Sequence, residues 1–161
     1  MQLQKSISFL LAVSMLLALS QPTLAQENGS SLREQIIGEW VAISIVSSGK
    51  KTAIPGERTQ ELNLKFKEKD FEVREHKAKA EKADGFKGSY LLNTDHQPAT
   101  LDLILGNTER DKIVGIVRIE DGKLILCVDS LMGRLKRPNK FESTEGSGFD
   151  LVILKRVAKN N

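Results

Sequence analysis

A strict alternation of apolar and polar residues is the feature that most constrains what this chain can fold into. In residues 61–67, apolar Leu62, Leu64 and Phe66 occupy every second position and polar residues fill the rest. Successive side chains of an extended strand point to opposite faces, so a period of two places the apolar residues on one face. One face then packs against a core while the other meets water, which is typical of an antiparallel sheet.

Short strands joined by tight turns continue over the rest of the chain. We predict strands over residues 40–46, 52–54, 61–67, 71–74, 86–93, 100–105, 112–120, 123–128 and 149–156. Asp121-Gly122 is a strong hairpin turn. Eight or nine such strands, without a long helix or a parallel crossover, favour an all-β fold. The prediction is a single antiparallel up-and-down β-barrel of about eight strands, which leaves no exposed sheet edge. A two-sheet β-sandwich is the alternative.

A short helix is predicted to precede the first strand. Ser30 or Ser31 can cap a helix over residues 32–37, and Gly38 would end it. Its apolar residues share one face, which could plug one end of the barrel.

The first 25 residues have the pattern of a secretory signal peptide. Lys5 supplies a positive start, residues 7–19 are apolar, and Thr23 and Ala25 are small residues before a predicted cut. The apolar run is short for a membrane anchor, so we expect cleavage without stable membrane insertion and an exported, periplasmic or extracellular protein beginning at Gln26. The expected division is a signal peptide at 1–25, a mobile tail at 26–31, the barrel domain at 32–156 and a C-terminal tail at 157–161.

Charge and motifs argue against two classes of function. The chain has 24 Lys and Arg against 21 Asp and Glu, a formal net charge of +3, whereas nucleic-acid binding favours a strongly basic surface. No Ser-His-Asp order, metal motif or phosphate loop stands out, so we predict no enzyme activity and no cofactor. Asp95 and His96 are only two neighbouring metal ligands, and nothing singles out Asp95 and Asp102 as a catalytic carboxylate pair.

Cys127 is the only cysteine, so we expect no internal disulfide. It lies in the apolar stretch Leu124–Val128, where a thiol behaves as a small buried hydrophobe. A nucleophilic cysteine would need an activating neighbour, and neither histidine of the chain lies in a recognisable catalytic context. We interpret Cys127 as a buried and unreactive thiol.

Two charged segments interrupt the rhythm of strands. Residues 131–141 hold four basic residues and no acid. Arg134 and Arg137 of this loop are the candidate ligands for an anionic head group, because a guanidinium can bind a carboxylate or phosphate bidentately; a solvated loop without a ligand is the alternative. Residues 75–85 predict a solvated helical turn or a long hairpin tip, since their acids dilute their lysines.

Trp40 and Arg156 are predicted to meet where the barrel closes. Trp40, the only tryptophan, begins the first strand and Arg156 ends the last. In an antiparallel pairing of first and last strands these positions lie at the same end. An indole offers a π face over which a guanidinium can stack. We interpret the pair as structural, with any ligand entering from the opposite end.

An ordered set of short motifs carries a family resemblance. The motifs are Gly38-Glu39-Trp40, Tyr90, Pro98-Ala99-Thr100-Leu101-Asp102-Leu103, Gly115-Ile116, Asp121-Gly122-Lys123-Leu124, Leu126-Cys127, Arg137-Pro138-Asn139-Lys140-Phe141, Gly146-Ser147-Gly148 and Leu154-Lys155-Arg156. In these the chain resembles, over residues 32–156, the lipocalin-like domain found in many copies in planctomycete bacteria, a family of uncharacterised function. Two features depart from the family pattern: Val117 replaces a frequent aromatic, and the charged stretch at 75–85 looks long.

The resemblance implies a barrel with a tryptophan at its closed end, covered by a basic residue of the final strand, and a ligand cavity inside. It supplies no catalytic residues, and a fold alone does not fix a function. We therefore expect a non-enzymatic module of the cell envelope that binds a small apolar or amphipathic molecule in the barrel. The alternative is a packed structural or protein-interaction module without a ligand cavity.

Overall fold

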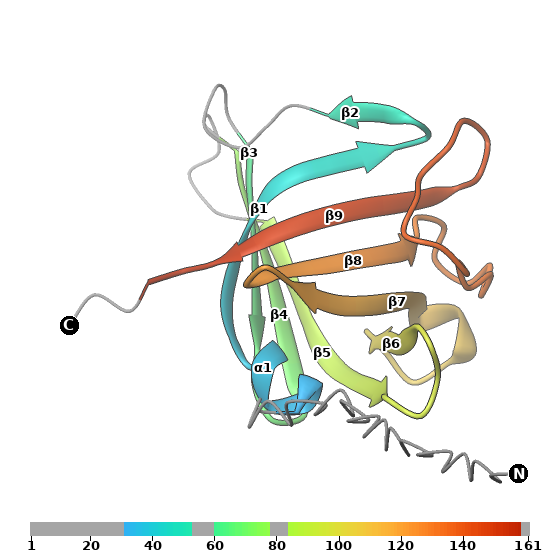
Figure 1. Ribbon diagram of the computed structural model, residues 1–161. Coiled ribbons are helices and arrows are strands. Elements are labelled where there is room, and N and C mark those ends of the chain that lie inside the picture. Colours follow the sequence, from blue (N-terminus) through green and yellow to red (C-terminus); the bar gives the residue numbers. More distant parts are fainter. Residues whose placement is uncertain (1–30, 53–59, 78–83, 159–161) are drawn as a thin grey trace, which may run out of the picture.

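The computed structural model describes residues 31–52, 60–77 and 84–158. The predicted signal peptide, its cut after Ala25 and most of the predicted tail at 26–31 lie outside these residues. Within the described part of the chain there are one short α-helix, one turn of 3-10 helix and nine strands (Figure 1).

The elements follow one another along the chain, with a long loop between the last two strands. They are α1 (Leu32–Ile36), β1 (Gly38–Ser47), β2 (Lys50–Thr52), β3 (Gln60–Phe66), β4 (Asp70–Lys77), β5 (Asp84–Asn93), β6 (Ala99–Ile104), η1 (Glu109–Asp111), β7 (Lys112–Glu120), β8 (Lys123–Asp129) and β9 (Phe149–Arg156). Ser31 caps α1, since its side chain accepts a hydrogen bond from the Glu34 amide and the Glu34 carboxylate accepts one from the Ser31 amide. The helix ends before Gly38, because Ile37 is already extended and Gly38 belongs to β1.

Eight antiparallel strands close into a barrel. From β3 to β9 each strand pairs with the next one in sequence, and β1 pairs with both β3 and β9. β2 lies beside this ring of strands and pairs with the last residues of β1. Because the first and last strands pair, the predicted up-and-down barrel is confirmed and the alternative β-sandwich is excluded.

A β-bulge lets β1 pair with different strands along its length. Its register with β9 shifts between Ala42 and Ser44, so Ile43 is an extra residue. The first half of β1 pairs with β3 and its last three residues pair with β2. A bulge bends a strand and increases its twist, and Figure 1 shows β1 turning sharply between its two halves. The extra residue also shifts the inward positions of β1 to Trp40, Ala42 and Ile45.

Several predicted strand boundaries differ from the structure. Ser48 and Gly49 both have positive φ angles and form a tight turn, so β2 starts at Lys50 instead of residue 52. The charged stretch at 75–85 is partly extended: β4 continues to Lys77 and β5 begins at Asp84. The remaining residues of that stretch, 78–83, lie outside the described residues.

The core fills the half of the barrel that lies next to α1, which we call the closed end. Its fully buried side chains include Ile36, Trp40, Phe66, Phe71, Leu101, Val117, Leu124 and Leu154. Phe66 meets the Tyr90 ring edge-on, with centroids 5.2 Å apart. The Tyr90 hydroxyl donates a hydrogen bond of 2.8 Å to the Lys67 carbonyl in the turn after β3. This polar contact satisfies the one hydroxyl that the aromatic cluster brings into the core.

Residues 130–148 run outside the barrel and form what we call the cover loop. A second buried group lies on the outer face of β7 and β8, made of Val114, Ile116, Ile125 and Cys127. The Cys127 thiol donates to the Glu142 carbonyl of the cover loop, with sulfur and oxygen 3.4 Å apart. The predicted burial of Cys127 is confirmed, and it comes from the cover loop and not from the barrel interior.

Candidate functional site

At the closed end, α1, Trp40 and Arg156 form one interlocked group. The Trp40 indole N–H donates to the Ile36 carbonyl at 2.8 Å. The Arg156 guanidinium lies over the indole, with Cζ 4.3 Å from the ring centroid, and donates to the carbonyls of Ile37 and Gln35. The guanidinium therefore satisfies carbonyls at the end of α1 while it covers the ring.

Gly38 is required by this group for a steric reason. A Cβ atom at this position would lie 2.3 Å from Arg156 Nη1, and the φ angle of Gly38 is +136°. Other residues rarely adopt such a backbone conformation. The Gly-x-Trp spacing thus lets Arg156 pass close to the backbone and reach both the indole and α1, which gives this end a structural role.

Arg134, a candidate anion ligand, is bound to Asp129. The Arg134 Nη2 lies 2.7 Å from Asp129 Oδ1, and Nε lies 3.0 Å from both carboxylate oxygens. The Asp129 carboxylate also accepts hydrogen bonds from the amides of Leu131 and Lys136. Burial acts to raise the pKa of Asp129, but these hydrogen bonds outweigh it and hold the pKa below its usual range.

Arg137, the second candidate, links the cover loop to the barrel wall. Its Nη2 forms a close ion pair with Asp102 Oδ1 on β6, at 2.6 Å but without hydrogen-bond geometry. Its Nη1 donates to the Gly115 carbonyl on β7, also at 2.6 Å. An anion bound at Arg134 or Arg137 would have to compete with these contacts, and anion binding by this loop stays a prediction.

Arg137 and Asp102 also line a surface groove of about 660 Å³ that includes Asp95 and His96. The structure thus brings together several residues that are far apart in the sequence. Arg33 of α1 lines the same groove and donates to the Leu92 carbonyl at 2.9 Å. Sequence reasoning missed Arg33, because it sits on a short helix whose docking position has no local signal.

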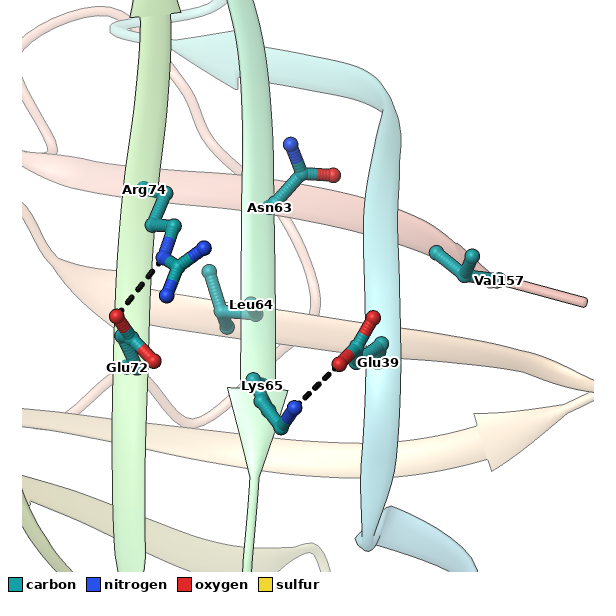
Figure 2. Close-up of a pocket in the computed structure, with 7 residues that line it drawn as sticks. All are labelled: Glu39, Asn63, Leu64, Lys65, Glu72, Arg74 and Val157. Carbon is teal, nitrogen blue, oxygen red and sulfur yellow. Dashed lines mark hydrogen bonds and ion pairs between the residues drawn. The ribbon is translucent and has the colours of Figure 1, made fainter. Parts of the chain in front are cut away.

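A second groove, of about 240 Å³, lies on the outer face of β1, β3 and β4 (Figure 2). Figure 2 shows its charges already paired: Lys65 with Glu39, and Arg74 with Glu72. The hydrogen bond from Lys65 lowers the pKa of Glu39, and that from Arg74 lowers the pKa of Glu72. Alternating charges across neighbouring strands are typical of a solvated sheet face.

The end of the barrel opposite α1 differs from the closed end, and we call it the open end. Apolar inward side chains here form what we call the open-end ring: Ile45, Leu62, Phe86, Leu105, Ile113 and Val128. Phe86 is 41% exposed, whereas Trp40 and Phe66 at the closed end are each 1% exposed. Among the described residues, the interior is therefore filled at the closed end and only partly covered at the open end.

Asp150 belongs to the same end. It lies opposite Val128 of β8 and Ser47 of β1 in the strand ladders, and residues opposite each other in antiparallel strands share a face. Sequence reasoning missed this residue. The signal was present, because Asp150 occupies the first place in the inward series that continues with Val152 and Leu154.

Residues 31–52, 60–77 and 84–158 contain no cluster of three His, Cys, Asp or Glu side chains that could hold a metal ion. In the same ranges, no helix has the length and apolar character needed to cross a bilayer.

Comparison with known proteins gives a distant structural likeness. No family model matches the chain, and no curated protein matches it. Among solved structures, the chain is similar to a crystal structure of a mutant of the fluorescent protein UnaG. The TM-score is 0.40 and the identity 12%, over 78% of this chain and 99% of that chain. The barrel assignment rests on the strand pairing above and not on this likeness.

Proposed function

We propose that the chain is an exported, non-enzymatic binding module that holds a small apolar or amphipathic molecule at the open end of its barrel. The open-end ring carries the proposal, because partly exposed apolar side chains line the inside of the barrel there. An eight-stranded barrel is wide enough to hold one small ligand. The closed end is sealed by Trp40, Arg156 and α1, so a ligand would enter from the opposite side.

The test uses N-phenyl-1-naphthylamine, a neutral apolar probe that fluoresces when it leaves water. We expect saturable binding to the wild-type protein. Ile113→Trp places a large ring inside the open end and should weaken binding by about tenfold or more. Leu91→Trp is the matched control, since Leu91 lies on β5 and is 61% exposed. Absence of saturable binding, or equal effects of the two variants, would contradict the proposal.

The alternative, a protein-interaction module, has one observation in its favour. Leu131, Met132 and Leu135 of the cover loop are 55%, 55% and 40% exposed, and exposed apolar groups can mark a contact with another protein. If the probe does not bind to the open end, this alternative is preferred.

Export and family membership are part of the proposal and rest on the sequence. A cut after Ala25 is testable by intact-mass analysis of the protein recovered from a secreting host. A product that begins at Gln26 would support export, and a product that retains residues 1–25 would contradict it. Membership of the planctomycete lipocalin-like family likewise rests on the motifs from Gly38 to Arg156.

A further inference from the structure

Asp150 is an acidic residue on the apolar inner face of the barrel. Along β9 it precedes Val152 and Leu154, which are 8% and 0% exposed and belong to the interior core. Its partner across the ladder to β8 is Val128, a member of the open-end ring. The carboxylate therefore lies at the open end of the barrel, on the face of the sheet that points to the interior.

One carboxylate oxygen of Asp150 has an unusual environment. Its Oδ1 is buried and has no hydrogen-bond partner among the described residues. Burying a polar atom without a hydrogen bond is unfavourable, and such atoms in a native protein call for an explanation.

Two other carboxylates of this barrel, one buried and one half-buried, provide the comparison. Asp129 lies beside Arg134 and two backbone amides, and Asp102 lies 2.6 Å from Arg137. Both of these are on the outer face under the cover loop, where an arginine neutralises each one. Asp150, on the inner face, has no such arginine among the described residues.

The charged groups near Asp150 do not supply the missing partner for its carboxylate. In the row of the sheet that contains Asp150, Ser47 comes next and Lys50 of β2 follows it. Lys50 is exposed and two strands away, and the structure shows no ion pair between the two among the described residues.

We propose that the ligand of this barrel is an amphipathic cation, with an apolar body that packs on the open-end ring and a protonated amine that binds Asp150. This inference rests on the proposed function and narrows its ligand class. A carboxylate next to apolar side chains attracts an ammonium group more strongly than it would in water, because the local dielectric is lower. The same carboxylate repels an anionic head group, which gives selectivity.

The experiment compares three ligands of equal chain length by isothermal titration calorimetry: decylammonium, decanol and decanoate, each below its aggregation concentration. We expect wild-type protein to bind decylammonium about tenfold or more tighter than decanol, and decanoate more weakly still. Asp150→Asn should abolish the preference for the amine. Asp150→Glu, which keeps the charge, should retain part of it.

Asp121→Asn is the matched control for net charge. Asp121 is exposed in the hairpin turn at the closed end, and its φ angle of 51° is one that asparagine also adopts. This variant should keep the preference for decylammonium. A preference lost equally in both Asn variants would mean that net charge, and not the position of Asp150, is responsible, and would overturn the inference.

The neutral probe distinguishes a loss of the preference for the amine from a loss of ligand binding at the open end. If N-phenyl-1-naphthylamine binds at the open end but the amine is not preferred, or if Asp150→Asn keeps the preference, the inference is wrong and the proposed function stands. If the probe does not bind, both fail. Folding of Asp150→Asn is checked by its melting temperature, which we expect to equal or exceed that of the wild type, because a carboxylate with one buried oxygen that lacks a hydrogen bond is removed. If this variant does not fold, Asp150→Ser takes its place in the same comparison.

Discussion

The contact of Arg156 with Trp40 can be measured as an energy. Trp40→Ala removes a large side chain that is 1% exposed and should cost about 3–5 kcal/mol of unfolding free energy. Arg156→Ala should cost less, because the cation–π contact of an exposed guanidinium contributes only about 0.5–1 kcal/mol. The two effects should be non-additive, since the residues share one contact. Urea unfolding of both single variants and the double variant measures the coupling free energy between the two residues. Strictly additive changes in unfolding free energy would contradict a shared contact.

The buried Asp129 carboxylate makes a pH-dependent contribution to stability. Its folded-state pKa lies below its usual value of 3.8, so the carboxylate stabilises the fold at neutral pH, and this contribution is lost as the pH falls through the lowered folded-state pKa. Asp129→Asn should cost about 3 kcal/mol at pH 7 because it breaks a buried ion pair. The difference between variant and wild type should shrink in acid.

Glu72→Gln is the matched control for Asp129→Asn. It removes a carboxylate of the exposed Arg74–Glu72 pair, and exposed pairs contribute little to stability. Urea unfolding midpoints of the wild type and of both variants, measured from pH 7 down to about pH 3, test this pH dependence. Equal effects of the two substitutions, or a cost at Asp129 that does not vary with pH, would contradict the assignment.

At the scale of elements, the cover loop determines how Cys127 reacts. Burial raises the pKa of the thiol, and both burial and loss of the thiolate slow reaction with reagents. We expect native protein to react with a disulfide reagent far more slowly than protein in denaturant. Arg137→Gln removes the ion pair to Asp102 and should speed the reaction by loosening the loop, whereas Arg74→Gln should leave it unchanged. Rapid labelling of the wild type would show the loop to be an ineffective cover.

The elements differ in how far the sequence could predict them. Residues 61–67 predicted β3 well, because strict alternation leaves one orientation that buries Leu62, Leu64 and Phe66. The cover loop could not be predicted in this way, since it has no period and its contacts are with residues distant in sequence. Asp129, which follows the predicted strand 123–128, would be taken for a solvated residue until Arg134 and the backbone amides are seen around it.

At the scale of the whole molecule, the closed barrel should unfold as one unit. Trp40 is the only tryptophan and lies in the core at the seam between β1 and β9. Its fluorescence should therefore change at the same urea concentration as the far-ultraviolet circular dichroism, as for a two-state domain. A fluorescence midpoint clearly below that of the circular dichroism would mean that the seam opens before the rest of the barrel.

The architecture as a whole was accessible from sequence because it depends on few choices. Sequential strands with tight turns favour a barrel, and closure then requires β1 to meet β9. The candidate site was much less accessible. Whether the interior is filled depends on the size of every inward side chain at once, and the bulge at Ile43, which reassigns the inward residues of β1, has no clear signal in the sequence. Asp150 can be identified as a candidate ligand-binding residue only once its position on the inner face is known.

The pairing of Trp40 with Arg156 also determines which end of the barrel would face a partner that is attached to the chain. Both ends of the described chain leave from the closed end, since α1 precedes β1 there and β9 finishes beside it. A surface or a neighbouring domain joined directly to Ser31 or Ala158 would therefore lie near the closed end. The open end that carries Asp150 would point away from such an attachment, so tethering close to these residues leaves access to Asp150 unobstructed.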